Sequence, residues 1–129
     1  MIESASEFVR LRSSEDPAEY NRASREEASM SVWRNVIDEH PQYRFWVAQN
    51  KTVPIEILKI LATDESATVR SMVASKRKLP DSLQVQLATD ADESVRAMLA
   101  RNAKVSGEAL EILAKDSSPL VLAAVEAKM

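Results

Sequence analysis

The chain has 129 residues, with 17 lysines and arginines against 20 aspartates and glutamates, so its formal net charge is −3. It contains one histidine, one glycine and no cysteine, which excludes disulfides, thiolate metal sites, cysteine nucleophiles and glycine-rich phosphate loops. The apolar fraction of 45% and the charged fraction of 29% are typical of one soluble globular domain.

Residues 1–30 predict two short helices. Phe8, Val9 and Leu11 indicate the first, and Asp16-Pro17 followed by 18–28 indicates the second, with Asp16 as the N-cap and Pro17 at the first helical position. This segment carries seven acids and four bases and lacks the apolar run of a secretory signal. We expect an N-terminal helical cap in a cytoplasmic protein.

An internal sequence repeat organises the rest of the chain. Residues 58–80 align without gaps on residues 84–106, so that the run 61–64, Leu-Ala-Thr-Asp, recurs at 87–90 with a shift of 26 in the numbering. Val69 and Arg70 recur in the same way as Val95 and Arg96. Further steps of the same size in both directions indicate four units between about residue 31 and residue 129.

The apolar spacing within each unit is helical. Leu58, Leu61 and Ala62 fall at i, i+3 and i+4, which predicts one apolar stripe on a short helix. Two such helices form each unit, and helices of about eight residues are unstable alone in water. Each unit must therefore bury its stripes against neighbouring units.

Polar residues between the stripes predict the helix ends. Asp64 and Asp90 are expected to cap the second helix of their units. Pro54 and Pro80 are expected at the start of the next first helix. Asn50 and Asn102 are expected to end second helices in the left-handed conformation.

These residues resemble a known family. The run 69–74, Val-Arg-Ser-Met-Val-Ala, followed by Leu79-Pro80, Leu83 and the run 87–90 is similar to the leucine-rich repeat variant, an α-helical repeat related to HEAT repeats. The resemblance implies an all-α fold, a short right-handed α-solenoid of about four two-helix repeats, in which residues 31–129 follow the cap of residues 1–30. It also implies a binding surface without enzymatic activity. Lys76 departs from the family pattern, because an asparagine usually ends that helix.

Four of the six aromatic residues lie in the first repeat: Trp33, Tyr43, Phe45 and Trp46. Large rings bury much apolar surface, so one interpretation is that they join the cap to the repeats. The alternative is an anchor for a partner, best represented by Phe45 beside Trp46, because the positions equivalent to Phe45 hold only serine or alanine.

Charged residues also follow the repeat. Arg44, Arg70 and Arg96 should form one row beside a second row of aspartates at 64, 90 and 116. Pairs between the rows would fix the stacking of repeats, whereas unpaired rows would form a charged groove for a peptide. The run Lys76-Arg77-Lys78 is either a solvated turn or a patch for an anion or acidic partner. Residues 31–129 are neutral overall, which does not favour binding to nucleic acid.

The last repeat is unusually apolar. Leu122 stands where the earlier repeats carry arginine, within the apolar run 120–125. This run is too short to span a membrane, which takes about 20 residues. We predict that Leu120, Leu122 and Val125 form a covered face, and a symmetric homodimer is one candidate. A different protein partner, or a small patch left exposed, are the alternatives.

Catalytic chemistry has little support in the sequence. His40 is the only histidine and precedes Pro41 in a turn, so neither a multi-histidine metal site nor a second catalytic base is available. Trp33, Asp38 and Trp46 resemble the pocket composition of alkylpurine glycosylases, which are larger and basic.

We predict a non-catalytic module that binds a peptide or protein surface, without cofactor. Two alternatives are an inhibitor, such as the immunity partner of a bacterial toxin, and a HEAT-like protein that acts on nucleic acid.

Overall fold

The computed structural model of the protein describes residues 1–129 and contains ten short α-helices and one 3-10 turn. The helices range from six residues in α4 to ten in α3. Extended structure is limited to an isolated bridge between Ile2 and Ala28. The prediction of an all-α protein is confirmed. The chain forms two compact units, Met1–Leu61 and Ala62–Met129.

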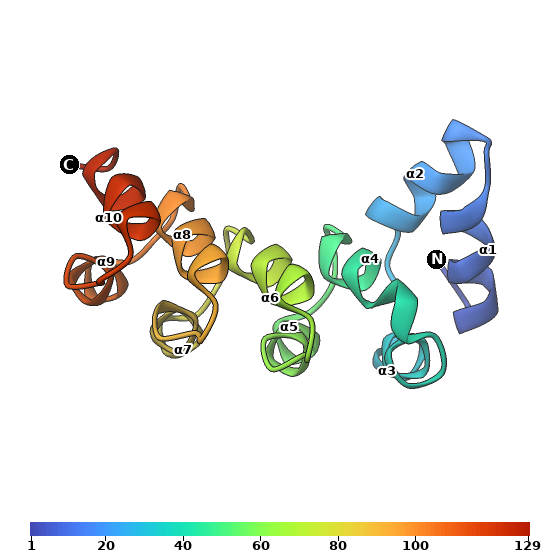
Figure 1. Cartoon of the computed structure of the whole chain (residues 1–129). Coiled ribbons are helices and arrows are strands. Elements are labelled where there is room, and N and C mark those ends of the chain that lie inside the picture. The colour runs from blue at the N-terminus through green and yellow to red at the C-terminus, as the bar shows by residue number, and fades with distance from the viewer. The chain divides into compact units, whose positions relative to one another are not determined.

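The first unit contains five helices and the 3-10 turn (Figure 1). Their bounds are α1 Ala5–Ser13, α2 Pro17–Arg25, α3 Met30–Glu39, η1 Pro41–Tyr43, α4 Arg44–Gln49 and α5 Ile55–Leu61. The Asp16 carboxylate accepts a hydrogen bond from the Ala18 N–H, and Pro17 opens α2, as predicted. Helix α1 contacts α2 and α3, and α2 contacts α4. The predicted cap therefore shares one packed unit with residues 31–61.

The core of the first unit centres on two rings. Phe8 of α1 and Trp33 of α3 are fully buried, and their centroids lie 5.3 Å apart in an edge-to-face arrangement. The Trp33 indole N–H has no hydrogen-bond partner, which costs about 1–3 kcal/mol for a buried donor. Burying the ring outweighs that cost, since removing such a side chain costs about 3–5 kcal/mol.

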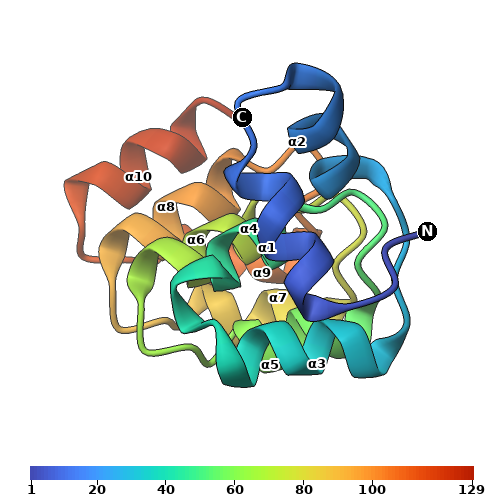
Figure 2. The same ribbon diagram turned by 90° about the vertical axis from the view of Figure 1, so that its right-hand side faces the viewer.

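The second unit holds five helices in two layers. Their bounds are α6 Ala67–Ala74, α7 Asp81–Ala88, α8 Glu93–Arg101, α9 Gly107–Leu113 and α10 Pro119–Glu126. Figures 1 and 2 show α6, α8 and α10 side by side in one layer, and the contacts of α8 with both α6 and α10 agree. Helices α7 and α9 contact each other in the other layer. Leu87, Leu99 and Leu113 are fully buried.

The predicted helix starts need a correction. The N-caps of α6 and α8 are Ser66 and Asp92, two residues after the expected Asp64 and Asp90. The Asp64 and Asp90 carboxylates instead accept from the backbone N–H two residues on, at 3.0 and 2.9 Å. Each aspartate thus shapes the turn before the helix. Pro80 lies at the start of α7, as predicted, in the N-cap position.

The predicted helix ends are confirmed in position but wrong in backbone conformation. Asn50 and Asn102 end α4 and α8, yet their φ angles are −56° and −61°, and no residue of the chain has a positive φ. Their amides bind neighbouring chain segments, which explains the choice of asparagine. The Asn102 Nδ2 donates to the carbonyls of Ala74 and Lys76 at 2.8 and 2.7 Å. Asn50 donates in the same way to Ala23 and Glu26.

Candidate functional site

Two arginines of the second unit bind aspartates 20 residues further along the chain, each in the turn that precedes the next helix of the same layer. Arg70 Nε lies 2.9 Å from Asp90 Oδ2, and Arg96 Nε lies 2.7 Å from Asp116 Oδ2. In both pairs Nη2 binds the other carboxylate oxygen. The pairs therefore have the bidentate geometry that makes arginine–carboxylate contacts strong and directional.

The same arginines also bind the turn before their own helix. Arg70 Nη1 donates to the Asp64 carbonyl and Arg96 Nη1 donates to the Asp90 carbonyl, each at 2.7 Å. Their side chains are only 16 and 17% exposed. The hydrogen bond between the partners raises the pKa of Arg96 and lowers the pKa of Asp116. Arg70 and Arg96 thus hold successive helices together, which matches the pairing predicted from the sequence.

Arg44, the third member of the predicted row, belongs to the first unit. Its Nε donates to the Ile37 carbonyl at 2.8 Å, which links α4 to the end of α3. The side chain is half-buried. This contact gives Arg44 a structural role in its own unit.

The turns that follow α6 and α8 are tied to each other. The buried Gln84 amide donates to the Leu79 carbonyl at 3.1 Å and accepts from the Ser106 N–H at 2.8 Å. Asn102 binds the Lys76 carbonyl, as described above. Of the predicted basic run, Arg77 and Lys78 are exposed and Lys76 is half-buried. The run lies on a turn that buried amides hold in place.

The outer surface of α6, α8 and α10 forms a strip of small and flexible side chains, which we call the α6–α8–α10 face. Its members recur at i, i+3 and i+4 on each helix and are exposed or half-buried: Thr68, Ser71, Met72, Ser75, Ser94, Met98, Arg101, Leu120, Ala123 and Ala127. Leu120 is 40% exposed. Leu122, predicted with it as a self-association residue, is half-buried, and Val125 is 3% exposed and belongs to the core.

Three of the four clustered aromatics contact the cap. Trp33 packs on Phe8. The Tyr43 hydroxyl lies 2.6 Å from the Ser13 hydroxyl. The Arg12 guanidinium stacks over the Trp46 ring, 3.5 Å from its centroid. Phe45 is half-buried and meets Trp46 edge to face at 4.8 Å.

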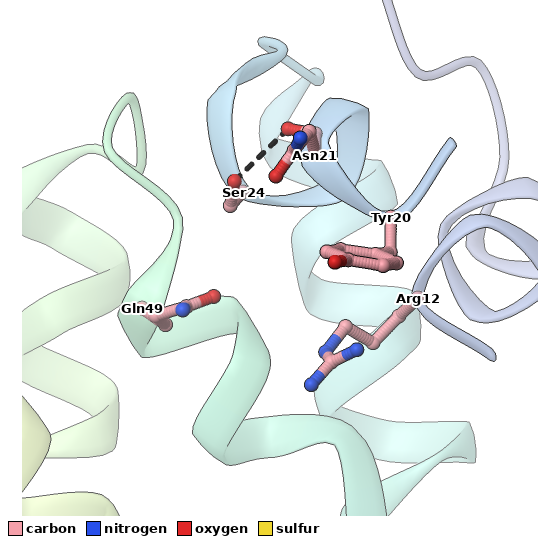
Figure 3. Close-up of a pocket in the computed structure, with 5 residues that line it drawn as sticks. All are labelled: Arg12, Tyr20, Asn21, Ser24 and Gln49. Carbon is pink, nitrogen blue, oxygen red and sulfur yellow. Dashed lines mark hydrogen bonds between the residues drawn. The ribbon is translucent and has the colours of Figure 1, made fainter. Parts of the chain in front are cut away.

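A pocket of about 340 Å³ opens beside this cluster in the first unit. Figure 3 shows Arg12 of α1, Gln49 of α4 and Tyr20, Asn21 and Ser24 of α2 around one open space. All five are polar or hydrogen-bonding side chains, and none is a carboxylate. The Ser24 hydroxyl donates to the Asn21 carbonyl at 2.9 Å. None of the five was predicted from the sequence. Arg12, Tyr20, Asn21 and Ser24 lie in residues 1–30, which have no periodic pattern to single them out, and Gln49 carries no distinctive signal of its own.

The residues considered for catalysis differ in burial. Trp33 is fully buried, whereas Asp38 is exposed and Trp46 is half-buried. His40 is half-buried and contacts Tyr43 edge to face. No cluster of three or more histidine, cysteine or acidic side chains could hold a metal ion. None of the helices has the length and apolar character needed to cross a membrane.

The fold and these sites define the protein as an all-α chain with a polar pocket and an extended helical face. Comparisons with family models, with curated proteins and with solved structures gave no match.

Proposed function

We propose that the protein is a non-catalytic binding module of the α-solenoid type. In this proposal about four copies of the two-helix repeat stack in a right-handed sense behind the helical cap of residues 1–30. The ligand is a peptide or the surface of another protein. Short helices that depend on their neighbours give such a stack an extended surface from many similar side chains.

The observation that carries this proposal is the α6–α8–α10 face. Ser71 on α6, Ser94 on α8 and Ala123 on α10 are small side chains of this face, so a partner backbone could approach the helices closely. Met72 and Met98 flank them and are half-buried. Methionine is flexible and polarisable, and is common on surfaces that adapt to a peptide. The Arg70–Asp90 and Arg96–Asp116 pairs hold these helices in register.

Site-specific photo-cross-linking in the native cell tests this proposal. A photoreactive residue at Ser71 or Met98 should give one or a few adducts of defined mass, which mass spectrometry identifies. The matched control is Gln86, which is exposed on α7 in the other layer. Adducts from Gln86 without adducts from Ser71 and Met98, or no adducts at all three positions, would contradict the proposal.

A further inference from the structure

Arg12 differs in its contacts from Arg22 and Arg44, the other half-buried arginines of the first unit. Arg10 pairs with Glu19 at 2.6 Å, and Arg22 pairs with Glu26. Arg12 is half-buried, and no hydrogen bond or ion pair engages its guanidinium. Its one specific contact is with the face of Trp46. The half-buried guanidinium therefore has no acidic partner within the chain.

We propose that the pocket formed by Arg12, Tyr20, Asn21, Ser24 and Gln49 binds a carboxylate group of an acidic peptide. The ring of Trp46 covers one face of the guanidinium, and its N–H groups remain available at the edge. A planar guanidinium binds a carboxylate through two parallel hydrogen bonds. Hydroxyl and amide groups from α2 and α4 surround the same space (Figure 3).

The charge of the pocket favours a carboxylate over a phosphate. Arg12 is the only charged residue that lines it, so one positive charge matches one singly charged anion. A phosphate group carries about two negative charges at neutral pH and would keep an excess negative charge there. The volume of about 340 Å³ lies at the lower end of the range for ligand pockets. It suits one side chain or chain end rather than a large ligand.

Trp46 acts as a positioning residue for this guanidinium. Stacking at 3.5 Å holds the plane of the arginine before any ligand arrives, and preorganised groups lose less conformational entropy on binding. Lysine has no planar group to stack or to form two parallel hydrogen bonds. Arg12→Lys should therefore weaken binding although it keeps the charge.

The source of the carboxylate, a partner peptide, rests on the proposed function as a binding module. The test uses N-acetylated, C-amidated triglutamate as the probe, with the triglutamine peptide as the uncharged control. Both are titrated into ¹⁵N-labelled protein at constant ionic strength. The protein has two indole N–H signals, from Trp46 beside the pocket and Trp33 in the core.

We expect triglutamate to shift the Trp46 signal saturably, with a Kd on the order of 1 mM, and to leave the Trp33 signal unchanged. Triglutamine should cause no saturable shift. Arg12→Gln should abolish the shift, and Arg12→Lys should weaken binding about tenfold. Arg25→Gln is the matched control, because Arg25 is exposed on α2 and does not line the pocket. This variant should bind like the wild type.

Three results would overturn the proposal. The first is no saturable shift of the Trp46 signal, and the second is a shift in Arg12→Gln and Arg12→Lys as large as in the wild type. The third is tighter binding of inorganic phosphate than of triglutamate. The Trp33 signal reports in each variant that the core is folded. If triglutamate fails while cross-links from Ser71 and Met98 persist, the pocket proposal is wrong and the binding-module proposal stands. If triglutamate binds but Ser71 and Met98 give no cross-links, the carboxylate pocket stands and the proposal that the α6–α8–α10 face binds a partner is wrong.

Discussion

Individual side chains set the spacing between successive helices of the second unit. The Asp90 and Asp116 side chains are each 9% exposed, and each binds an arginine from the preceding second helix. Both also accept a backbone N–H in their own turn, at 2.9 Å. One carboxylate therefore joins a turn to the helix of the repeat before it.

Loss of the arginine should be costly at this site. We expect Arg96→Gln to lower the free energy of unfolding by about 3 kcal/mol, because it leaves Asp116 buried without its partner. Urea unfolding at pH 7 measures the change. Arg101→Gln, at an exposed position of the same helix, should cost less than about 0.5 kcal/mol. Equal effects of the two substitutions would show that the Arg96–Asp116 pair contributes nothing.

Glu26 should make the stability of the first unit depend on acid. Hydrogen bonds from Arg22 and from the Met1 amino group lower the pKa of Glu26 from 4.5 to about 2. A carboxyl whose pKa is lower in the folded state stabilises the fold above its unfolded pKa. That stabilisation is fully present above pH 4.5 and is lost as the pH falls towards 2.

The comparison of wild type with Glu26→Gln isolates this contribution. The difference in urea midpoint between the two proteins should be largest at neutral pH and should shrink steadily between pH 4.5 and pH 2. A difference that stays constant over this range would mean that Glu26 has its ordinary pKa in the folded protein.

At the scale of the helix, side-chain caps recur at equivalent places. Ser66, Asp92 and Ser118 occupy the same position in successive repeats, and each accepts a backbone N–H at the start of α6, α8 or α10. A capping side chain contributes about 1 kcal/mol. The sequence repeat predicts that N-caps recur, but it does not predict which polar residue of the turn acts as the N-cap.

The single glycine gives a test at the same scale. Gly107 is the first residue of α9, and a Cβ added there would meet no atom within 4 Å. Its φ is negative, so alanine fits without strain. We expect Gly107→Ala to raise the free energy of unfolding by about 0.5 kcal/mol, by lowering the entropy of the unfolded chain. A destabilised variant in thermal or urea unfolding would show that α9 does not begin there.

At the scale of the whole molecule, much of the second unit could be predicted from the sequence. The spacing of the repeat predicts both the helices and the Arg–Asp pairs, because equivalent residues meet equivalent neighbours. Departures from the repeat are less predictable. Gln84 stands where the adjacent repeats carry leucine, and its buried amide joins two turns. Val125 was predicted to belong to a covered self-association face with Leu120 and Leu122, but it lies in the core.

The pocket of the first unit was beyond prediction for a physical reason. Arg12 and Tyr20 come from helices that do not repeat, so no spacing relates them to each other or to Gln49. Only packing of α1, α2 and α4 brings them together. The aromatic cluster was a usable signal, since Trp46 is the residue on which Arg12 stacks.

The proposed stacking of repeats has one direct test, the insertion of a second copy of residues 80–105 after residue 105. In this variant the copy of Asp90 falls opposite Arg96, and the copy of Arg96 falls opposite Asp116. The control variant carries a glycine-serine linker of the same length at the same place. Circular dichroism and urea unfolding of both variants and the wild type provide the measurement.

We expect the copied repeat to fold in register. The helical signal per residue should then equal that of the wild type, and the urea m-value should rise by about a fifth with the added buried surface. The linker variant should keep the wild-type m-value, and its helical signal per residue should fall by about a sixth. If the copied repeat behaves like the linker, these helices do not stack as interchangeable repeats.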